Sequence, residues 1–183
     1  MAYNYRDDPV LGPTLAYWLD KRGSRAMPRK ADIDPTEIAP KILPNLVIIQ
    51  VVDGGARFRY RLVGTALVDA YGKDFSGRHA DELFPDDQLN FVQSSYRTVC
   101  ASKLPLFSHN RYFRLKDTDL FSIRIYMPLS DDNQDVHHIL GVMRFEFGAS
   151  LDGGVWGAGA KLDPTWHYTE TIEIDARARE LAG

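Results

Sequence analysis

The residues best suited to chemistry are arginines that alternate with aromatic residues along one short stretch. Arg57, Arg59 and Arg61 occupy every second position there, and Phe58 and Tyr60 lie between them. Side chains of a β-strand point alternately to its two faces, so the three guanidinium groups would share one face. Guanidinium groups bind carboxylates and phosphates. This face is therefore either neutralised by acidic residues of the chain or available to an anion or a partner.

Acidic partners for these arginines are predicted in a proline-rich segment upstream. Arg124 and Arg144 lie in two later strand candidates and would extend the arginine face across the sheet. Like charges on adjacent strands are unfavourable without partners, and Asp32 and Asp34 of segment 28–35 would cross this face. We favour an ion-paired outer face over an anion or partner site. The structural ion-pair candidates are Asp32, Asp34, Arg59, Arg61, Arg124 and Arg144.

The opposite face of the predicted sheet is apolar and is either a filled core or the lining of a pocket. We expect it to carry Phe58, Tyr60, Leu62, Ile123, Ile125, Met127, Met143, Phe145 and Phe147. Ligand pockets in proteins are concave and mostly apolar, with a few polar groups that orient the ligand. The candidate pocket residues are Tyr60, Tyr71, Ser108, Tyr112, Tyr126 and Met143.

No combination of residues predicts catalysis or metal binding. The chain has no Gly-x-Ser-x-Gly motif, and its serine, histidine and aspartate residues have no spacing that implies a triad. The acidic turn that begins at Asp131 resembles a calcium loop, but Val136 and Val142 replace the glycine and glutamate that such a loop needs. The adjacent His137 and His138 would point to opposite faces of a strand. We therefore predict no catalytic residue, no metal site and no enzyme activity.

The composition predicts one soluble, cytoplasmic domain. The 183 residues suffice for a single domain with tails, and the net charge of −3 gives no attraction to nucleic acid. A single cysteine, Cys100, rules out an internal disulfide framework. The N-terminus has no apolar run, and no segment is long and apolar enough to cross a membrane.

The pattern of the chain predicts an α+β fold. Helices are expected at residues 10–21, 35–42, 64–71, 81–84 and 86–102. Strands are expected at residues 46–52, 57–63, 104–113, 120–129 and 138–147. Strands at both ends of a helical middle indicate a five-stranded antiparallel sheet. The predicted division is a flexible arm at 1–9, the domain at 10–147 and a partly flexible tail at 148–183.

This order of elements, together with several short motifs, resembles the PAS domain. The motifs are Tyr17-Trp18, Arg22-Gly23, Pro28–Pro35, Leu43–Leu46, Phe58–Thr65 and Gly72–Arg78. They are similar to those of a subfamily of short alphaproteobacterial PAS proteins, formerly described as a domain of unknown function. The resemblance covers about residues 10–147.

The resemblance implies a PAS-like sheet curved around a pocket that the helical middle closes. PAS domains bind small molecules or partner proteins and often dimerise through an N-terminal helix. We accordingly expect a non-catalytic sensory or adaptor module that forms a homodimer through the N-terminal helix and docks to a signalling partner. The cofactor is unknown. Covalent flavin is disfavoured because Cys100 lacks the Asn-Cys-Arg context of flavin-binding relatives, and haem is disfavoured because His79 is the one histidine in the helical middle.

Two alternatives remain open at this point. The first is a small cone-shaped α+β enzyme of the isomerase or dehydratase type, which also wraps a sheet around an apolar cavity. The second is a protein-interaction module whose cavity is filled by its own side chains. A buried Asp, Glu or His in the cavity would indicate the enzyme, and the predicted apolar face has none.

Overall fold

The computed structural model describes residues 3–113, 120–147 and 161–174. Its helices are α1 (Leu11–Arg22), α2 (Thr65–Tyr71) and α3 (Asp86–Ser102). Its strands are β1 (Leu46–Val52), β2 (Arg57–Val63), β3 (Leu106–Phe113), β4 (Leu120–Leu129), β5 (His138–Phe147) and β6 (Lys161–Thr171). All strand pairs are antiparallel, in the order β2-β1-β5-β4-β3-β6. The predicted α+β class is confirmed.

The hairpin of β1 and β2 forms where an apolar run meets two glycines. Gly54 and Gly55 have φ angles of 64° and 94°, which glycine adopts without steric cost, and they reverse the chain between the strands. The register changes from the Ile48–Leu62 pair to the Ile49–Tyr60 pair, so Arg61 forms a β-bulge on the edge strand. These interruptions end the regular alternation on which the prediction for β2 depended.

The sheet has six strands rather than the predicted five. The additional strand β6 pairs along β3, from Phe113–Lys161 to Leu106–Thr171. Its apolar side chains are poorly covered, since Trp166 and Tyr168 are 40% and 48% exposed. The strand therefore lacks the half-buried alternation that marks a strand in sequence, and backbone pairing with β3 determines its conformation. Residues 148–160 and 175–183 of the predicted tail lie outside the described part of the chain.

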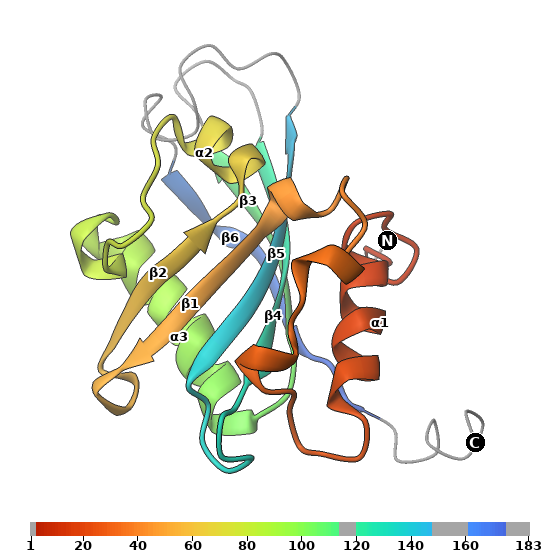
Figure 1. Ribbon diagram of the computed structural model, residues 1–183. Helices are drawn as coiled ribbons and strands as arrows, with labels where there is room; N and C mark the ends of the chain where they lie inside the picture. The colour runs from red at the N-terminus through yellow and green to blue at the C-terminus, as the bar shows by residue number, and fades with distance from the viewer. Residues whose placement is uncertain (1–2, 114–119, 148–160, 175–183) are drawn as a thin grey trace.

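The two faces of the sheet are covered by different helices (Figure 1). Helix α3 packs on one face, which we call the α3 face, where the Tyr96 ring contacts Phe58 and Tyr126. Helix α1 packs on β4 and β5 from the other side, which we call the α1 face. There the fully buried Trp18 donates its indole N–H to the Pro128 carbonyl at 2.9 Å. Strand β4 is thus buried on both sides.

The proline-rich connection from α1 to β1 consists of short 3-10 turns. They are Lys30–Asp32, Pro35–Glu37 and Leu43–Asn45. The helix predicted at 35–42 is therefore a single turn. Among the described residues, no helix has the length and apolar character that crossing a membrane requires.

Candidate functional site

A buried arginine organises the α3 face. Arg124 lies in the middle of β4 and is 2% exposed. Its guanidinium group donates to the Tyr112 hydroxyl at 2.9 Å, to the Tyr126 hydroxyl at 3.2 Å and to the Ser122 hydroxyl. We call these four residues the Arg124 cluster. Every partner in the cluster is a neutral hydroxyl group.

Three further tyrosines surround the Arg124 cluster. The hydroxyls of Tyr60 on β2 and Tyr96 on α3 are 2.8 Å apart and share a hydrogen bond. Burial raises the pKa of both, and it raises the pKa of Tyr71 on α2 although the charge of Arg124 opposes that shift. These tyrosines are therefore uncharged at neutral pH and do not neutralise Arg124.

A small cavity lies beside the Arg124 guanidinium group. Its volume is about 10 Å³, which is close to the space that a single water molecule occupies. The described residues that line it come from β3, β4, β5, β6 and the helical middle: Tyr71, Phe84, Gln88, Phe91, Val92, Tyr112, Arg124, Phe145 and Leu162. None of these side chains is acidic or a histidine. The space beside Arg124 is thus almost filled by the described side chains, and its centre is polar.

The six predicted pocket residues come together at this site. Tyr60, Tyr126 and Met143 lie on the α3 face, and Tyr71 approaches it from α2 and contacts Phe145. Ser108 and Tyr112 follow β3 on the same face, and each of the six is at most 9% exposed. Two of them, Tyr71 and Tyr112, line the cavity directly.

The predicted division of polar and apolar side chains between the two faces needs correction. Strand pairing places Ile123 opposite Arg144 and places Ile125 opposite Phe107, on the α1 face. Phe107 there contacts Tyr5 of the N-terminal segment, with ring centroids 4.7 Å apart. Met127 follows the same alternation, so Ile123, Ile125 and Met127 face α1 rather than the pocket. Because both faces of β4 are buried, alternation alone could not identify the face that lines the cavity.

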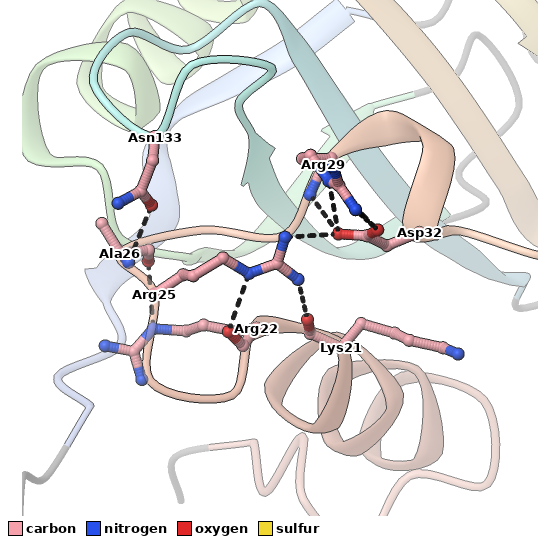
Figure 2. A network of polar contacts seen from close by, with 7 residues as sticks. All are labelled: Lys21, Arg22, Arg25, Ala26, Arg29, Asp32 and Asn133. Carbon is pink, nitrogen blue, oxygen red and sulfur yellow. Dashed lines mark hydrogen bonds and ion pairs between the residues drawn. The ribbon is translucent and has the colours of Figure 1, made fainter.

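The predicted partners of Asp32 also need correction. Asp32 accepts hydrogen bonds from the guanidinium groups of Arg25 at 2.7 Å and Arg29 at 3.0 Å, and it has no contact with the arginines of the sheet. Figure 2 shows the Arg25 guanidinium group between Asp32 and the carbonyl groups of Lys21 and Arg22 at the end of α1. We call Asp32, Arg25, Arg29 and the two carbonyl groups the Asp32 network. It ties the proline-rich connection to α1.

The loop between β4 and β5 is hydrogen-bonded to the segment that follows α1. Asn133 accepts a hydrogen bond from the Ala26 backbone at 3.1 Å (Figure 2). Arg22 donates to the Ala26 carbonyl at 3.0 Å. The guanidinium groups around Asp32 hold the pKa of this carboxyl group well below its usual range, chiefly through hydrogen bonds from Arg29. Asp32 is therefore ionised and fully compensated.

The remaining predicted ion-pair residues do not pair with one another among the described contacts. Asp34 accepts from the Thr36 backbone at 2.9 Å and so begins the Pro35–Glu37 turn. Arg59 donates to the Gly77 carbonyl at 2.9 Å, whereas Arg61 is exposed. The ion-paired outer face that was predicted across β2, β4 and β5 does not form, because Arg124 lies on the opposite face and β2 is an edge strand.

Arg144 is a sheet arginine with a buried acidic partner. It lies on the α1 face and forms an ion pair with Asp8, which is 4% exposed. Asp8 also accepts from the backbone of Val10 and of Leu11, both at 2.8 Å, at the start of α1. Burial opposes ionisation of Asp8, but the donors around it lower its pKa below the usual value. Part of the predicted flexible arm, residues 3–9, is thus placed against the sheet.

The residues considered for cofactor chemistry lie away from the cavity. Cys100 is half-buried on α3, and burial raises the pKa of its thiol to about 11, which disfavours the reactive thiolate. His79 lies at the β2 edge, where its Nδ1 is 3.1 Å from the Glu82 carboxylate. Neither residue is among those that line the cavity.

Ser122, Asn110 and Tyr96 are interior polar groups that were not predicted from the sequence. Asn110 donates to Ser108 at 2.7 Å and is fully buried. The sequence did contain a signal that Ser122 and Arg124 face the interior. The apolar stripe of α1 must pack on an apolar sheet face, and Ile123 and Ile125 can form that face. Arg124, which lies between them on the strand, then points to the opposite face of the sheet.

One of three comparisons with known proteins identifies a family for this chain. A family model described as a PAS domain matches residues 8–144 of the chain. Comparisons with curated proteins and with solved structures give no match. The family match spans from the buried Asp8 to Arg144, so it includes α1, the helical middle and five strands. Because it covers more than half of the 183 residues, the chain belongs to the PAS domain family.

Proposed function

We propose that this protein is a non-catalytic sensory module that binds a small molecule between the α3 face and the helices α2 and α3. Membership of the PAS domain family supports a sensory or interaction role, although a fold does not fix a function. The six tyrosine, serine and methionine side chains predicted to bind a ligand would contribute to this site.

The Arg124 cluster is the observation that carries the proposal. A domain of this size can be stabilised by apolar packing alone, and a buried guanidinium group costs several kcal/mol of desolvation. Among the described residues, the ion pairs do not include Arg124. A polar centre that costs stability is more typical of a binding site than of a structural core.

The cavity lining also favours binding over catalysis. An isomerase or dehydratase of the cone-shaped type would place an acid or base beside its substrate. The described lining residues carry a guanidinium group, a carboxamide (Gln88), tyrosine hydroxyl groups and apolar side chains. Arg124 can orient an anionic group, but it does not exchange protons at neutral pH.

The small volume of the cavity supports a second candidate function. A space of about 10 Å³ holds one water-sized occupant and no metabolite of ordinary size. A protein-interaction module with a filled interior therefore remains the alternative. Its exposed surfaces, such as β6 with Trp166 and Tyr168, would then carry the function.

We further propose that the module acts in the cytoplasm, as a homodimer and through a signalling partner. Trp18 covers the sheet within one chain, so a dimer through α1 would use residues of that helix that remain exposed, such as Pro13 and Ala16. In a reducing compartment the free thiol of Cys100 would stay reduced.

Native mass spectrometry of protein purified without added ligand tests the sensory proposal. The expected result is a dimer mass, with a small molecule that remains bound in the gas phase and is released on denaturation. Bare protein, combined with no change in melting temperature across a panel of neutral and charged small molecules, would favour the interaction module instead.

A further inference from the structure

The interior of this protein holds a positive charge that the described residues do not neutralise. Three hydroxyl groups accept hydrogen bonds from Arg124, but hydroxyl groups carry no charge. The Nε–H of Arg124 is buried and has no acceptor among the described residues. Buried charges in proteins are normally paired with an opposite charge or coordinated by one. Arg124 is an exception to this rule.

We propose that the cavity beside Arg124 binds a small anion, of the size of chloride or formate. The inference rests on the proposed ligand site and names the chemical class of its ligand. Arg124 lines the cavity and would supply the charge, and its Nε–H is a donor without an acceptor in the described part of the chain. The volume of about 10 Å³ holds one water-sized occupant such as chloride, and the larger formate ion fits only when neighbouring side chains move.

The surroundings of the cavity favour an anion over a neutral ligand. No acidic side chain is among the described residues that line it, so an anion would meet no like charge in contact. Tyr112 of the Arg124 cluster lines the cavity, and its hydroxyl group can rotate, so that it could donate to an anion as well as accept from the guanidinium group.

A second small cavity suggests the route by which the anion enters. It also measures about 10 Å³, shares Tyr71 and Phe84 with the first, and is lined by Lys73. Lys73 is exposed, so a second positive charge lies where the route would reach solvent. Movement of the Phe84 side chain would join the two cavities.

A water molecule is the competing occupant. Asn110 is on the same face as Ser122, and its buried Oδ1 also has no donor among the described residues. A water could donate to that oxygen and accept from Arg124. If water occupies the cavity, the melting temperature should respond equally to neutral and charged solutes of similar size. If the cavity is an anion site, only the charged solute should raise the melting temperature.

Formate and formamide distinguish these possibilities because they are nearly isosteric and differ in charge. We would measure the melting temperature of the full chain while formate replaces gluconate at constant ionic strength, with formamide added to parallel samples. We expect the melting temperature to rise with the logarithm of formate concentration above Kd, by roughly 5–10 °C at about 100 times Kd. Formamide should give no such rise. Equal responses to the two compounds would overturn the anion proposal.

Two variants assign the effect to one arginine. Arg124→Met should lose the formate response, whereas Arg144→Met, a matched change on the neighbouring strand and the opposite face, should keep it. If Arg124→Met does not fold, Arg124→Lys should retain a reduced formate response. Persistence of the full response in Arg124→Met would contradict the proposal. A neutral molecule found by native mass spectrometry together with no formate response would leave the sensory function standing and reject the anion.

Discussion

Asp32 meets two guanidinium groups near the surface, whereas Arg124 meets three hydroxyl groups in the interior. In the Asp32 network a partly exposed carboxylate is fully compensated, and water also screens the charges. In the Arg124 cluster a fully buried charge has only dipoles as partners. The first arrangement holds two segments of the chain together. The second arrangement lowers the stability of the folded state unless a bound anion compensates the charge of Arg124.

The pair of Arg144 and Asp8 shows how a half-buried sheet arginine with a structural role is neutralised in this protein. Arg144 lies one strand from Arg124 and on the other face, and it has a buried carboxylate as its partner. The chain therefore can supply an acidic partner to a sheet arginine, and it does so for Arg144 but, among the described residues, not for Arg124. The predictions below test this difference, from the largest expected effect to the smallest.

Trp18→Ala should have the largest effect, because it removes the side chain that fixes α1 to β4. The side chain is fully buried and its indole N–H is hydrogen-bonded. Truncating it should lower the free energy of unfolding by about 3–5 kcal/mol. Urea denaturation followed by circular dichroism measures this loss. Tyr17→Phe, which removes only a partly exposed hydroxyl, is the matched control and should cost about 1 kcal/mol. Equal losses would show that α1 is not anchored by Trp18.

Asp8→Asn should cost about 2 kcal/mol, because it removes the buried carboxylate that pairs with the half-buried Arg144 and leaves only the more distant, exposed Glu146. Asp7→Asn, at the exposed neighbour, should change the unfolding free energy by less than about 0.5 kcal/mol. The measurement is again the midpoint of urea denaturation. A neutral result for Asp8→Asn would remove the contrast between the two sheet arginines.

The Asp8 carboxylate should also shape the dependence of stability on pH. Its pKa is lower in the folded protein than in the unfolded chain, so its stabilising contribution is present above about pH 4 and is lost as the pH falls through the folded pKa. The stability difference between wild type and Asp8→Asn should therefore shrink below about pH 4. Thermal melts from pH 7 to pH 2 measure it. A difference that is constant over this range would contradict the role given to Asp8.

The double variant Asp32→Ala with Asp34→Ala should cost about 1–2 kcal/mol, since it removes the centre of the Asp32 network and the side chain that begins the Pro35–Glu37 turn. The control is Asp69→Ala with Asp135→Ala, which removes two exposed carboxylates elsewhere. The loss in the first variant should decrease in high salt. Equal melting temperatures of the two double variants would argue against a structural role of the network.

Arg124→Met should have the smallest effect in the absence of added small anions, despite the complete burial of the side chain. Replacing an uncompensated buried charge by an apolar side chain of similar length should change stability by less than about 1 kcal/mol, in either direction. Urea denaturation in gluconate buffer tests this. A loss of several kcal/mol would indicate that the Arg124 cluster is a structural core element like Trp18.

Much of the fold could be predicted from sequence because local signals agreed with the tertiary structure. The limits of Leu120–Leu129 and His138–Phe147 follow from alternation on both sides of an acidic turn. The strand Lys161–Thr171 could not be predicted, because its side chains stay largely exposed and its pairing with β3 is a long-range effect.

The candidate site was predicted in part, for a related reason. The tyrosines were identified because an apolar face with few hydroxyl groups is typical of a pocket. Arg124 was assigned to the wrong face, since a polar residue in an alternating strand normally points to solvent. That rule fails where helices cover both faces of the sheet, as α1 and α3 do here.

A crystal of the protein soaked in bromide tests most directly whether Arg124 organises an anion site. Bromide is slightly larger than chloride and can be located by its anomalous scattering. The account predicts an anomalous peak in the cavity, within hydrogen-bonding distance of the Arg124 Nε, that is absent from Arg124→Met crystals. An ordered water at that position with no anomalous signal, in crystals that bind bromide elsewhere, would contradict it.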